Sequence, residues 1–326
     1  MEEQKIAKDS LILKVRVGSR LYGTSTPESD EDFVGIFLPP VEYLIGLRRV
    51  NEVNAGVTAK GENGKNTKDA IDFTCYTLEK FARLALENNP NILEVLFVNK
   101  ENIVYWHPLG AALLKMRYKF LSKCIKQRFL NYALSQKHNM VIKLENYKKL
   151  SAARDYLLHT DKRFMIEIIE SEVHPVYKSV FKREKDEINI GDLIVPATAT
   201  TKRTLRQIQN RLDKFGSRQE LVKSYGYDTK FACNLIRLMS EGVELLETGD
   251  LKFPLKEAPL IKNIRYGKYT MEEVLKMSEE YENRIESLSV SSAVPELPDY
   301  DAISKFVMDV HKTKICSKDE GRLIWT

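Results

Sequence analysis

The chain lacks the features that mark several large classes of protein. No apolar run approaches the roughly 20 residues that a membrane-spanning helix needs. The opening MEEQKIAKDS lacks the basic and then apolar pattern of a secretory signal. We find neither an internal repeat nor a low-complexity tract. A globular protein of the cytoplasm, without a membrane segment, is therefore expected.

Cysteine and histidine are scarce and scattered. The four cysteines, Cys75, Cys124, Cys233 and Cys316, include no C-x-x-C pair, and the five histidines show no metal-ligand spacing. This pattern argues against a disulfide framework and against a zinc site. We expect reduced thiols, as in a cytoplasmic protein.

An ordinary globular composition is combined with an uneven distribution of charge. The chain has 326 residues, 43% of them hydrophobic and 30% charged, which is enough for one large or two modest domains. Although the net charge is only +5, the segment Lys115–Arg163 holds thirteen Lys or Arg against three acids. Such a block favours a polyanionic partner, but a solvated, lysine-rich helix surface would explain it equally well.

The spacing of apolar residues changes near residue 78. Before this point, alternation predicts strands over Leu11–Val17, Asp32–Leu38 and Ala70–Tyr76, with a polar hairpin or loop over 51–68. After it, a 3.6-residue period predicts helices near 78–88, 92–97, 109–136, 138–158, 203–214, 229–248, 271–288 and 300–315. The segment 164–199 is ambiguous, and its INIGDLIVP is either a short strand pair or a loop. We therefore expect an α+β protein with an N-terminal sheet and a mainly helical C-terminal region.

Two aspartates enter the second predicted strand after a Gly-Ser step. The first strand ends at Gly18-Ser19, ten residues pass, and the triplet Asp30-Glu31-Asp32 follows. In an extended segment Asp30 and Asp32 project to one face, while Glu31 points away. Two close carboxylates repel each other unless a cation lies between them, and such paired oxygens suit Mg²⁺. The Gly-Ser turn supplies backbone N–H groups and a hydroxyl where a triphosphate could lie.

This arrangement resembles the signature of the DNA polymerase β-like nucleotidyltransferase superfamily: a Gly-Ser step, a spacer of about ten residues and Asp-x-Asp at the next strand. The stretch GSRLYGTSTPESDEDFVGIF is similar, in particular, to the nucleotidyltransferases associated with RNA repair. Further matches to that family run nearly from end to end, and they are DFTCYTL from Asp72, NPNILE from Asn89, YGYDTK from Tyr225, NLIRL from Asn234, ETG from Glu247, IRYG from Ile264 and LPD from Leu297.

The resemblance implies a polymerase β-like sheet with flanking helices. Residues 1–105 would form the catalytic core, and residues 106–326 a helical domain that contributes acceptor and triphosphate contacts. Asp30, Asp32 and Asp72 would be the catalytic residues. They would bind two Mg²⁺ ions, for which Mn²⁺ could substitute, and Asp72 would help to deprotonate the attacking hydroxyl.

The resemblance also implies a nucleoside triphosphate substrate, with ATP the first choice. Gly18 and Ser19 would hold its β- and γ-phosphates. Lys230 and Arg237, on a later helix, are candidate contacts to phosphate or to the acceptor. Tyr22 would either stack on a base or pack against the protein.

Several positions keep a second interpretation. Asp69, three residues before Asp72, could be the third acid, although the step to Leu78 favours Asp72. Asp228 could be only the N-cap of its helix. Similar proteins commonly carry His where this chain has Asn234, so no acid–base role is carried to that position. Taken alone, the SDED sequence is also typical of surface loops.

Three functions compete. The first is transfer of a nucleoside monophosphate from NTP to an RNA 3′ hydroxyl, such as that of tRNA, with the basic region 115–163 contacting the RNA. The second is nucleotidylation of a small molecule or a protein, as in antibiotic-modifying or toxin-like relatives, which would not need that basic region. The third is a catalytically dead binding protein, against which the intact set of three aspartates argues. We prefer the first, while the sequence leaves the nucleotide, the acceptor and the oligomeric state undefined.

Overall fold

The computed structural model describes residues 2–27, 29–57, 71–171, 177 and 179–316. The chain divides into two compact units. Unit 1 comprises Met1–Ala133, Ile236–Lys262 and Met277–Thr326, and unit 2 comprises Leu134–Leu235 and Asn263–Lys276. The dividing points fall inside four helices, which are α7 (Cys124–His159), α12 (Thr229–Thr248), α13 (Ala258–Arg265) and α14 (Met271–Ser291). Residue 105, the expected domain boundary, lies within unit 1, and the division into 1–105 and 106–326 stays a prediction.

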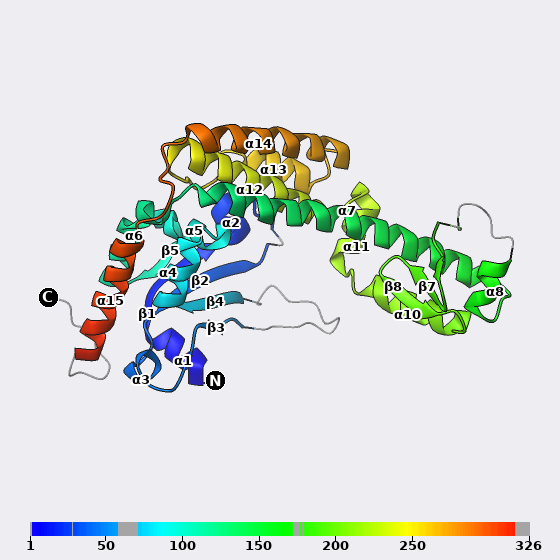
Figure 1. Cartoon of the computed structure of the whole chain (residues 1–326), viewed down its shortest axis with the longest axis horizontal. Coiled ribbons are helices and arrows are strands. Elements are labelled where there is room, and N and C mark those ends of the chain that lie inside the picture. Colours follow the sequence, from blue (N-terminus) through cyan, green and yellow to red (C-terminus); the bar gives the residue numbers. More distant parts are fainter. Residues whose placement is uncertain (1, 28, 58–70, 172–176, 178, 317–326) are drawn as a thin grey trace. The chain divides into compact units, whose positions relative to one another are not determined.

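Unit 1 is built on a five-stranded sheet of order β3-β4-β2-β1-β5 (Figure 1). Its strands are β1 (Leu11–Val17), β2 (Glu31–Phe37), β3 (Glu52–Asn54), β4 (Ile71–Thr77) and β5 (Ile103–Trp106). Strands β2 and β4 are parallel, and the other neighbouring strands are antiparallel. The three strands predicted from alternation are confirmed to within one residue at each end. The short edge strands β3 and β5 were not predicted, because three or four residues are too few to show a period.

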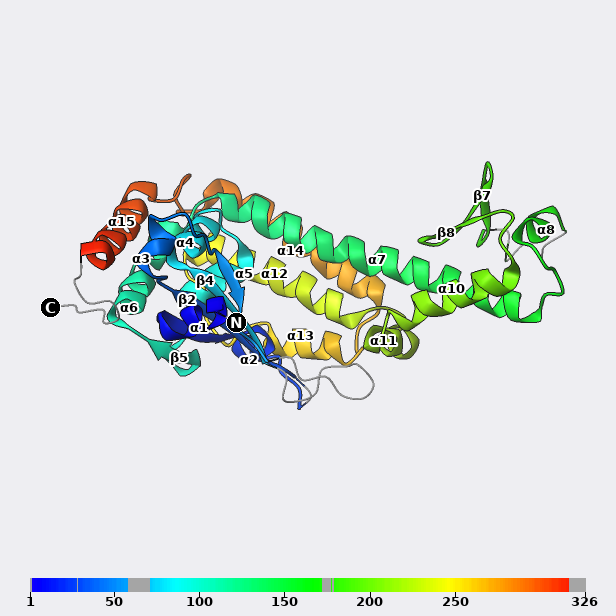
Figure 2. The same cartoon turned by 90° about the horizontal axis from the view of Figure 1, so that it is seen from below.

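The two faces of this sheet are covered by different elements. Helix α1 (Glu2–Asp9) packs against one face, where buried Ala7 belongs to a cluster with Phe37, Phe73 and Cys75 (Figures 1 and 2). Helices α4 (Leu78–Leu86) and α5 (Pro90–Leu96) contact β1, β2 and β4. In Figure 1, α1 lies below the sheet and α5 above it.

Local sequence explains where the helices after β4 begin. The hydroxyl of Thr77 accepts from Lys80 N and caps α4, while the side chain of Asn89 accepts from Asn91 N and caps α5, which has Pro90 at its start. The remaining elements of unit 1 are α2 (Gly18–Tyr22), α3 (Val41–Leu44), η1 (Lys100–Asn102), α6 (Pro108–Lys115), η2 (Arg117–Phe120) and α15 (Tyr300–Cys316).

The helix predicted over 109–136 is wrong, because the chain is interrupted there. Helix α6 ends at Lys115, and α7 begins only at Cys124. Buried Asn88 holds the intervening segment: its amide donates to Phe120 O at 2.6 Å, and its carbonyl oxygen accepts from Ser122 N at 3.1 Å. The break predicted at residue 137 is also wrong. Helix α7 runs through it for 36 residues that include neither Gly nor Pro.

Unit 2 has its own small antiparallel sheet of order β6-β7-β8. Its strands are β6 (Lys182–Glu184), β7 (Glu187–Ile190) and β8 (Leu193–Pro196), so INIGDLIVP forms the strand pair and not the loop. Among the described residues, the other elements that lie wholly in this unit are α8 (Met165–Glu170), α10 (Thr201–Asp213) and α11 (Ser217–Tyr225). Ile188, Ile190, Ile208 and Leu212 are fully buried.

The α+β fold class is thus confirmed. In the part of the chain that the structure describes, no helix combines the length and apolarity needed to cross a membrane. All four cysteines are free thiols, in agreement with the prediction from their spacing.

Candidate active site

The predicted acids gather at one end of the parallel strand pair. Asp32 of β2 lies directly opposite Asp72 of β4 in the strand register, so their side chains project from the same face of the sheet. Asp72 is exposed and Asp32 is half-buried. Asp30 is exposed and immediately precedes β2, close enough for its charge to act on Asp32. Asp69, the alternative third acid, lies outside the described residues.

The pKa of Asp32 reflects both its burial and the acids around it. Burial, followed by the nearby charges of Asp72, Asp30 and Glu31, raises its pKa from the ordinary 3.8 to about 6, while Arg20 acts in the opposite direction. A carboxylate whose neighbours are mainly other carboxylates is stabilised by a bound cation. The pKa shift therefore fits a cation site better than it fits a solvated surface loop.

Glu31 points away from the other acids, although its charge contributes to the raised pKa of Asp32. Its carboxylate pairs with Arg16 Nε at 3.0 Å and with Arg20 Nε at 2.9 Å. Register places Glu31 on the face of the sheet opposite to Asp32, as the alternation predicted. The two arginines keep the middle acid of the triplet away from its neighbours.

Gly18 brings the main chain against Asp32. Helix α2 begins at Gly18 directly after β1, with Gly18 at φ +71°. A Cβ atom on Gly18 would overlap Oδ2 of Asp32. Only glycine combines this backbone angle with the space left beside the carboxylate. The Gly-Ser step and the aspartates, 14 residues apart in sequence from Gly18 to Asp32, are thus adjacent in the fold.

The three aspartates have the oxygen ligands that a divalent cation requires, but their side chains are not arranged around a common point. Within the described residues, no group of three or more His, Cys, Asp or Glu side chains is arranged to hold a metal ion as it stands. Asp30 and Asp72 are exposed, while Asp32 faces the space that Gly18 leaves empty. Oxygen ligands of this kind are those that Mg²⁺ and Mn²⁺ prefer.

The other two predicted contacts lie on α12, and the structure describes their surroundings. Lys230 is exposed in the first turn of this helix, within unit 2. Asp228 caps the helix, because its Oδ1 accepts from Lys230 N at 3.0 Å, and its Oδ2 accepts from Arg218 at 2.7 Å. The N-cap interpretation of Asp228 is therefore confirmed. A phosphate contact by Lys230 stays a prediction.

Arg237 is enclosed by protein carboxylates. It is 6% exposed, and its Nη1 donates to Glu94 and to Glu241. The ring of Tyr22 packs against the guanidinium, with 4.7 Å between the ring centroid and Cζ. Tyr22 thus packs against the protein. In this position Arg237 presents no exposed N–H to a phosphate, so a direct contact remains only a prediction from the sequence.

Glu94 and Glu241 were not predicted as functional residues, although two signals were available. Glu94 ends the NPNILE match, and Glu241 lies four residues after Arg237, on the same side of α12. Both are buried acids, at 1% and 0% exposure. A buried acid is unfavourable unless it is hydrogen-bonded or paired with a cation, so each of these two residues requires such a partner in the fold.

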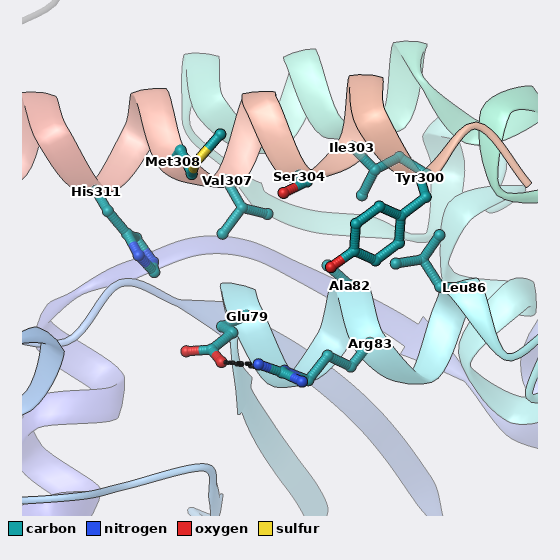
Figure 3. Close-up of a pocket in the computed structure, with 10 residues that line it drawn as sticks. All are labelled: Glu79, Ala82, Arg83, Leu86, Tyr300, Ile303, Ser304, Val307, Met308 and His311. Carbon is teal, nitrogen blue, oxygen red and sulfur yellow. Dashed lines mark hydrogen bonds and ion pairs between the residues drawn. The ribbon is translucent and has the colours of Figure 1, made fainter.

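A groove of about 250 Å³ lies apart from these residues, between α4 and α15 (Figure 3). Glu79 and Arg83 form an ion pair of 2.8 Å along its α4 side, and Tyr300 and His311 lie at its two ends on α15. None of the predicted site residues lines it. The groove is therefore separate from the predicted active site.

The pKa of Asp32 leads to a prediction about stability. Since this pKa is higher in the folded protein than in the unfolded chain, the folded state binds the proton more tightly. The resulting stability is complete below pH 3.8 and is lost as the pH rises through about 6. We expect Asp32→Asn, which carries no charge, to stabilise the metal-free protein at pH 8 by about 1 kcal/mol, a value reduced for the solvent exposure of this side chain.

Thermal unfolding in EDTA, at pH 5 and at pH 8, measures this effect. The advantage of Asn over Asp should be smaller at pH 5. Adding Mg²⁺ at pH 8 should raise the melting temperature of the wild type but not that of the variant. An equal advantage at both pH values would contradict the assignment of a raised pKa to Asp32.

Comparison with known proteins gives three results. Residues 1–161 match the model of the RNA repair pathway DNA polymerase beta family, RlaP. An uncharacterized 38.9 kDa protein of Enterobacteria phage T4, from the nrdC-mobD intergenic region, is 27% identical over 315 residues, covering 86% of this chain and 90% of the relative. A nucleotidyltransferase-like protein from Exiguobacterium sibiricum aligns with 95% of this chain and 77% of its own length, at 9% identity and a TM-score of 0.26, too low to bear on function.

Proposed function

We propose that the chain, whose residues 1–161 match the RNA repair pathway DNA polymerase beta family, transfers a nucleoside monophosphate from NTP to a hydroxyl group at an RNA 3′ end. The family match implies nucleotidyl transfer chemistry and an NTP substrate. We further propose RNA as the acceptor, tRNA as the kind of RNA, and ATP as the nucleotide.

The observation that carries this proposal is the pairing of Asp32 with Asp72 beside Gly18. The two carboxylates share one face of the sheet, and Gly18 lies against that of Asp32. A triphosphate received by the backbone N–H groups and hydroxyl of the Gly18–Ser19 turn would have its α-phosphate near the acids. Asp30 adds a third carboxylate at the solvent side.

The roles of the residues follow from this placement. Asp30, Asp32 and Asp72 would hold the divalent ions, which supply charge neutralisation to the reacting phosphate and the leaving pyrophosphate. Asp72 is exposed, so it can accept the proton of an approaching hydroxyl. Gly18 and Ser19 would orient the triphosphate.

Label transfer tests the proposal directly. The purified chain is incubated with each α-labelled NTP in turn and Mg²⁺ or Mn²⁺, with and without total tRNA. Label in RNA that depends on the metal supports the proposal. Label in the protein itself or in a small molecule would favour the alternative acceptor class, and no transfer with any NTP and any of these acceptors would overturn the proposed activity.

Charge is the observation that favours RNA as the acceptor. Unit 2 holds 22 Lys and Arg against 15 Asp and Glu, a net of +7, so the rest of the chain is at −2. In the basic region 115–163, the residues that lie in unit 1 are partly neutralised, since Lys119, Lys123 and Lys126 pair with Asp299, Glu296 and Glu286. The basic charge available to a polyanion therefore belongs mainly to unit 2.

Exposed cations on α10 give the sharpest test of this surface. Lys202, Arg203 and Arg206 are exposed, share one side of the helix, and form no ion pair with the described residues. We expect their triple replacement by Glu to weaken tRNA binding at least tenfold and to reduce the dependence of affinity on salt, because fewer counterions are released. Fluorescence anisotropy over a salt series measures both quantities.

The matched control makes the same charge change on unit 1. Lys5, Lys305 and Lys312 are exposed there and are replaced by Glu together. This control should bind tRNA within about threefold of wild type. If the two triple variants lose affinity equally, net charge and not the α10 surface explains RNA binding.

A further inference from the structure

Four polar side chains from three separate elements, three of them buried and Tyr22 half-buried, meet inside unit 1. Tyr22 ends α2, Glu94 lies in α5, and Arg237 and Glu241 lie one turn apart on α12. Arg237 Nη1 donates to Glu94 Oε1 and, at 3.0 Å, to Glu241 Oε2. The hydroxyl of Tyr22 donates to Glu94 Oε2 at 2.6 Å. We call these residues the buried cluster.

Removing the charged groups of the buried cluster from water has a high desolvation cost. It contains two carboxyl groups for one guanidinium, and burial raises the pKa of Glu241 well above its ordinary value, with Arg237 acting in the opposite direction. Apolar side chains of similar volume commonly stabilise a core as well as such a group does, or better. Stability alone therefore explains the buried cluster poorly.

What the buried cluster holds in place is the C-terminal end of α2. Besides the bond from Tyr22 to Glu94, the main-chain oxygen of Tyr22 accepts from Leu255 N at 3.1 Å. The next residue, Gly23, lies so close to Pro254 that a Cβ atom would come within 2.7 Å of its ring. Both the side chain and the main chain fix this end of the helix.

The other end of α2 is the Gly18–Ser19 turn. Helix α2 has only five residues, so at 1.5 Å per residue its two ends are about 7 Å apart. One end lies against Asp32, and the other ends in the buried cluster. A short helix moves as a rigid piece, so a shift of Tyr22 would displace Gly18 and Ser19.

We propose that Arg237, through Glu94 and Tyr22, is a positioning residue that fixes the Gly18–Ser19 turn against Asp32 for the triphosphate. This inference rests on the proposed function. It gives α12, more than 200 residues later in the chain, a role in the nucleotide site without contact to the nucleotide. It also explains why an arginine in the NLIRL match is buried with two acids.

Tyr22→Phe separates positioning from direct contact. The variant keeps the ring against the guanidinium and keeps Arg237 itself, but it removes the hydrogen bond to Glu94. If Arg237 contacted phosphate directly, this change would leave nucleotide binding unaltered. Under the positioning role, the affinity for a triphosphate should fall about tenfold. With the transferred NTP, KM should rise by a similar factor, while kcat stays within about threefold.

Calorimetric titration of the full chain with inorganic tripolyphosphate and Mg²⁺ measures this without a choice of base. Tyr227→Phe is the matched control, because the hydroxyl of buried Tyr227 donates to Tyr269 O at 2.8 Å within unit 2. It should bind tripolyphosphate as wild type does. Arg237→Met is a second variant, expected to weaken binding at least as much as Tyr22→Phe.

The outcomes are distinguishable. Weaker binding by Tyr22→Phe, with unchanged binding by Tyr227→Phe, supports the positioning role. Wild-type binding by Tyr22→Phe overturns that role and leaves the proposed function standing. Equal weakening in both tyrosine variants shows a general loss of stability and also overturns it. If wild type binds neither tripolyphosphate nor any NTP in the presence of metal, the proposed function itself fails.

Discussion

Asp32→Asn is expected to lower nucleotidyl transfer roughly a thousandfold, because Asp32 is the acid that shares the sheet face with Asp72 and adjoins Gly18. The variant keeps the shape of the side chain but removes the charge that a divalent ion requires. Label transfer from α-labelled NTP measures the loss, and a melting curve shows that the fold is intact.

Glu31→Gln is the matched control for this experiment. It removes the same charge one residue away, on the opposite face of β2, where Glu31 pairs with Arg16 and Arg20. Half-exposed ion pairs of this kind contribute little to stability, so we expect activity within a few-fold of wild type. Full activity in Asp32→Asn, or wild-type activity in EDTA, would end the metal-dependent mechanism.

Gly18→Ala is expected to lower activity roughly a hundredfold. The added methyl group would overlap the Asp32 carboxylate, and the backbone angle of +71° is unfavourable for any side chain. The carboxylate must therefore move, which disturbs its geometry toward a cation and toward the triphosphate. Steady-state kinetics and the Mg²⁺-induced change in melting temperature should both be affected.

Gly249→Ala separates backbone strain from the steric effect. Gly249 has a similar angle of +67°, but a Cβ atom there meets no atom within 4 Å. We expect about 1 kcal/mol of destabilisation and normal kinetics. If Gly249→Ala loses as much activity as Gly18→Ala, strain and not contact with Asp32 explains the loss.

The sequence indicated the parts of the site whose residues lie close together along the chain, but not the contacts between residues that lie far apart. Gly18, Asp30 and Asp32 lie within one short segment, where strand alternation alone determines which side chains share a face. The pairing of Asp72 with Asp32 came from resemblance, since no local rule aligns two parallel strands. The pairing of Arg237 with Glu94 was beyond reach because a helix pattern shows which side of α12 is apolar, not which acid of α5 meets it.

The fold shows the same division. The strands with clear alternation were predicted to within one residue, while α1 was missed because its polar sequence, EEQKIAKD, presents little more than Ile6 and Ala7 to the sheet. The end of α6 was missed because the group that fixes it, Asn88, is remote in sequence. A hydrogen bond between residues far apart in the sequence fixes this boundary, and helix propensity does not reveal it.

The parallel pairing of β2 and β4 has a consequence for the order of assembly during folding. Strand β1 reaches β2 across 13 residues, whereas β2 reaches β4 only after the chain between residues 37 and 71 has closed into a loop. Closure of the longer loop costs more entropy, so we expect the β1–β2 pair to form first. Asp32 and Asp72 then meet late, when the surrounding strands can already tolerate their repulsion. In a nascent chain the two carboxylates would thus come together only after the other strands have paired.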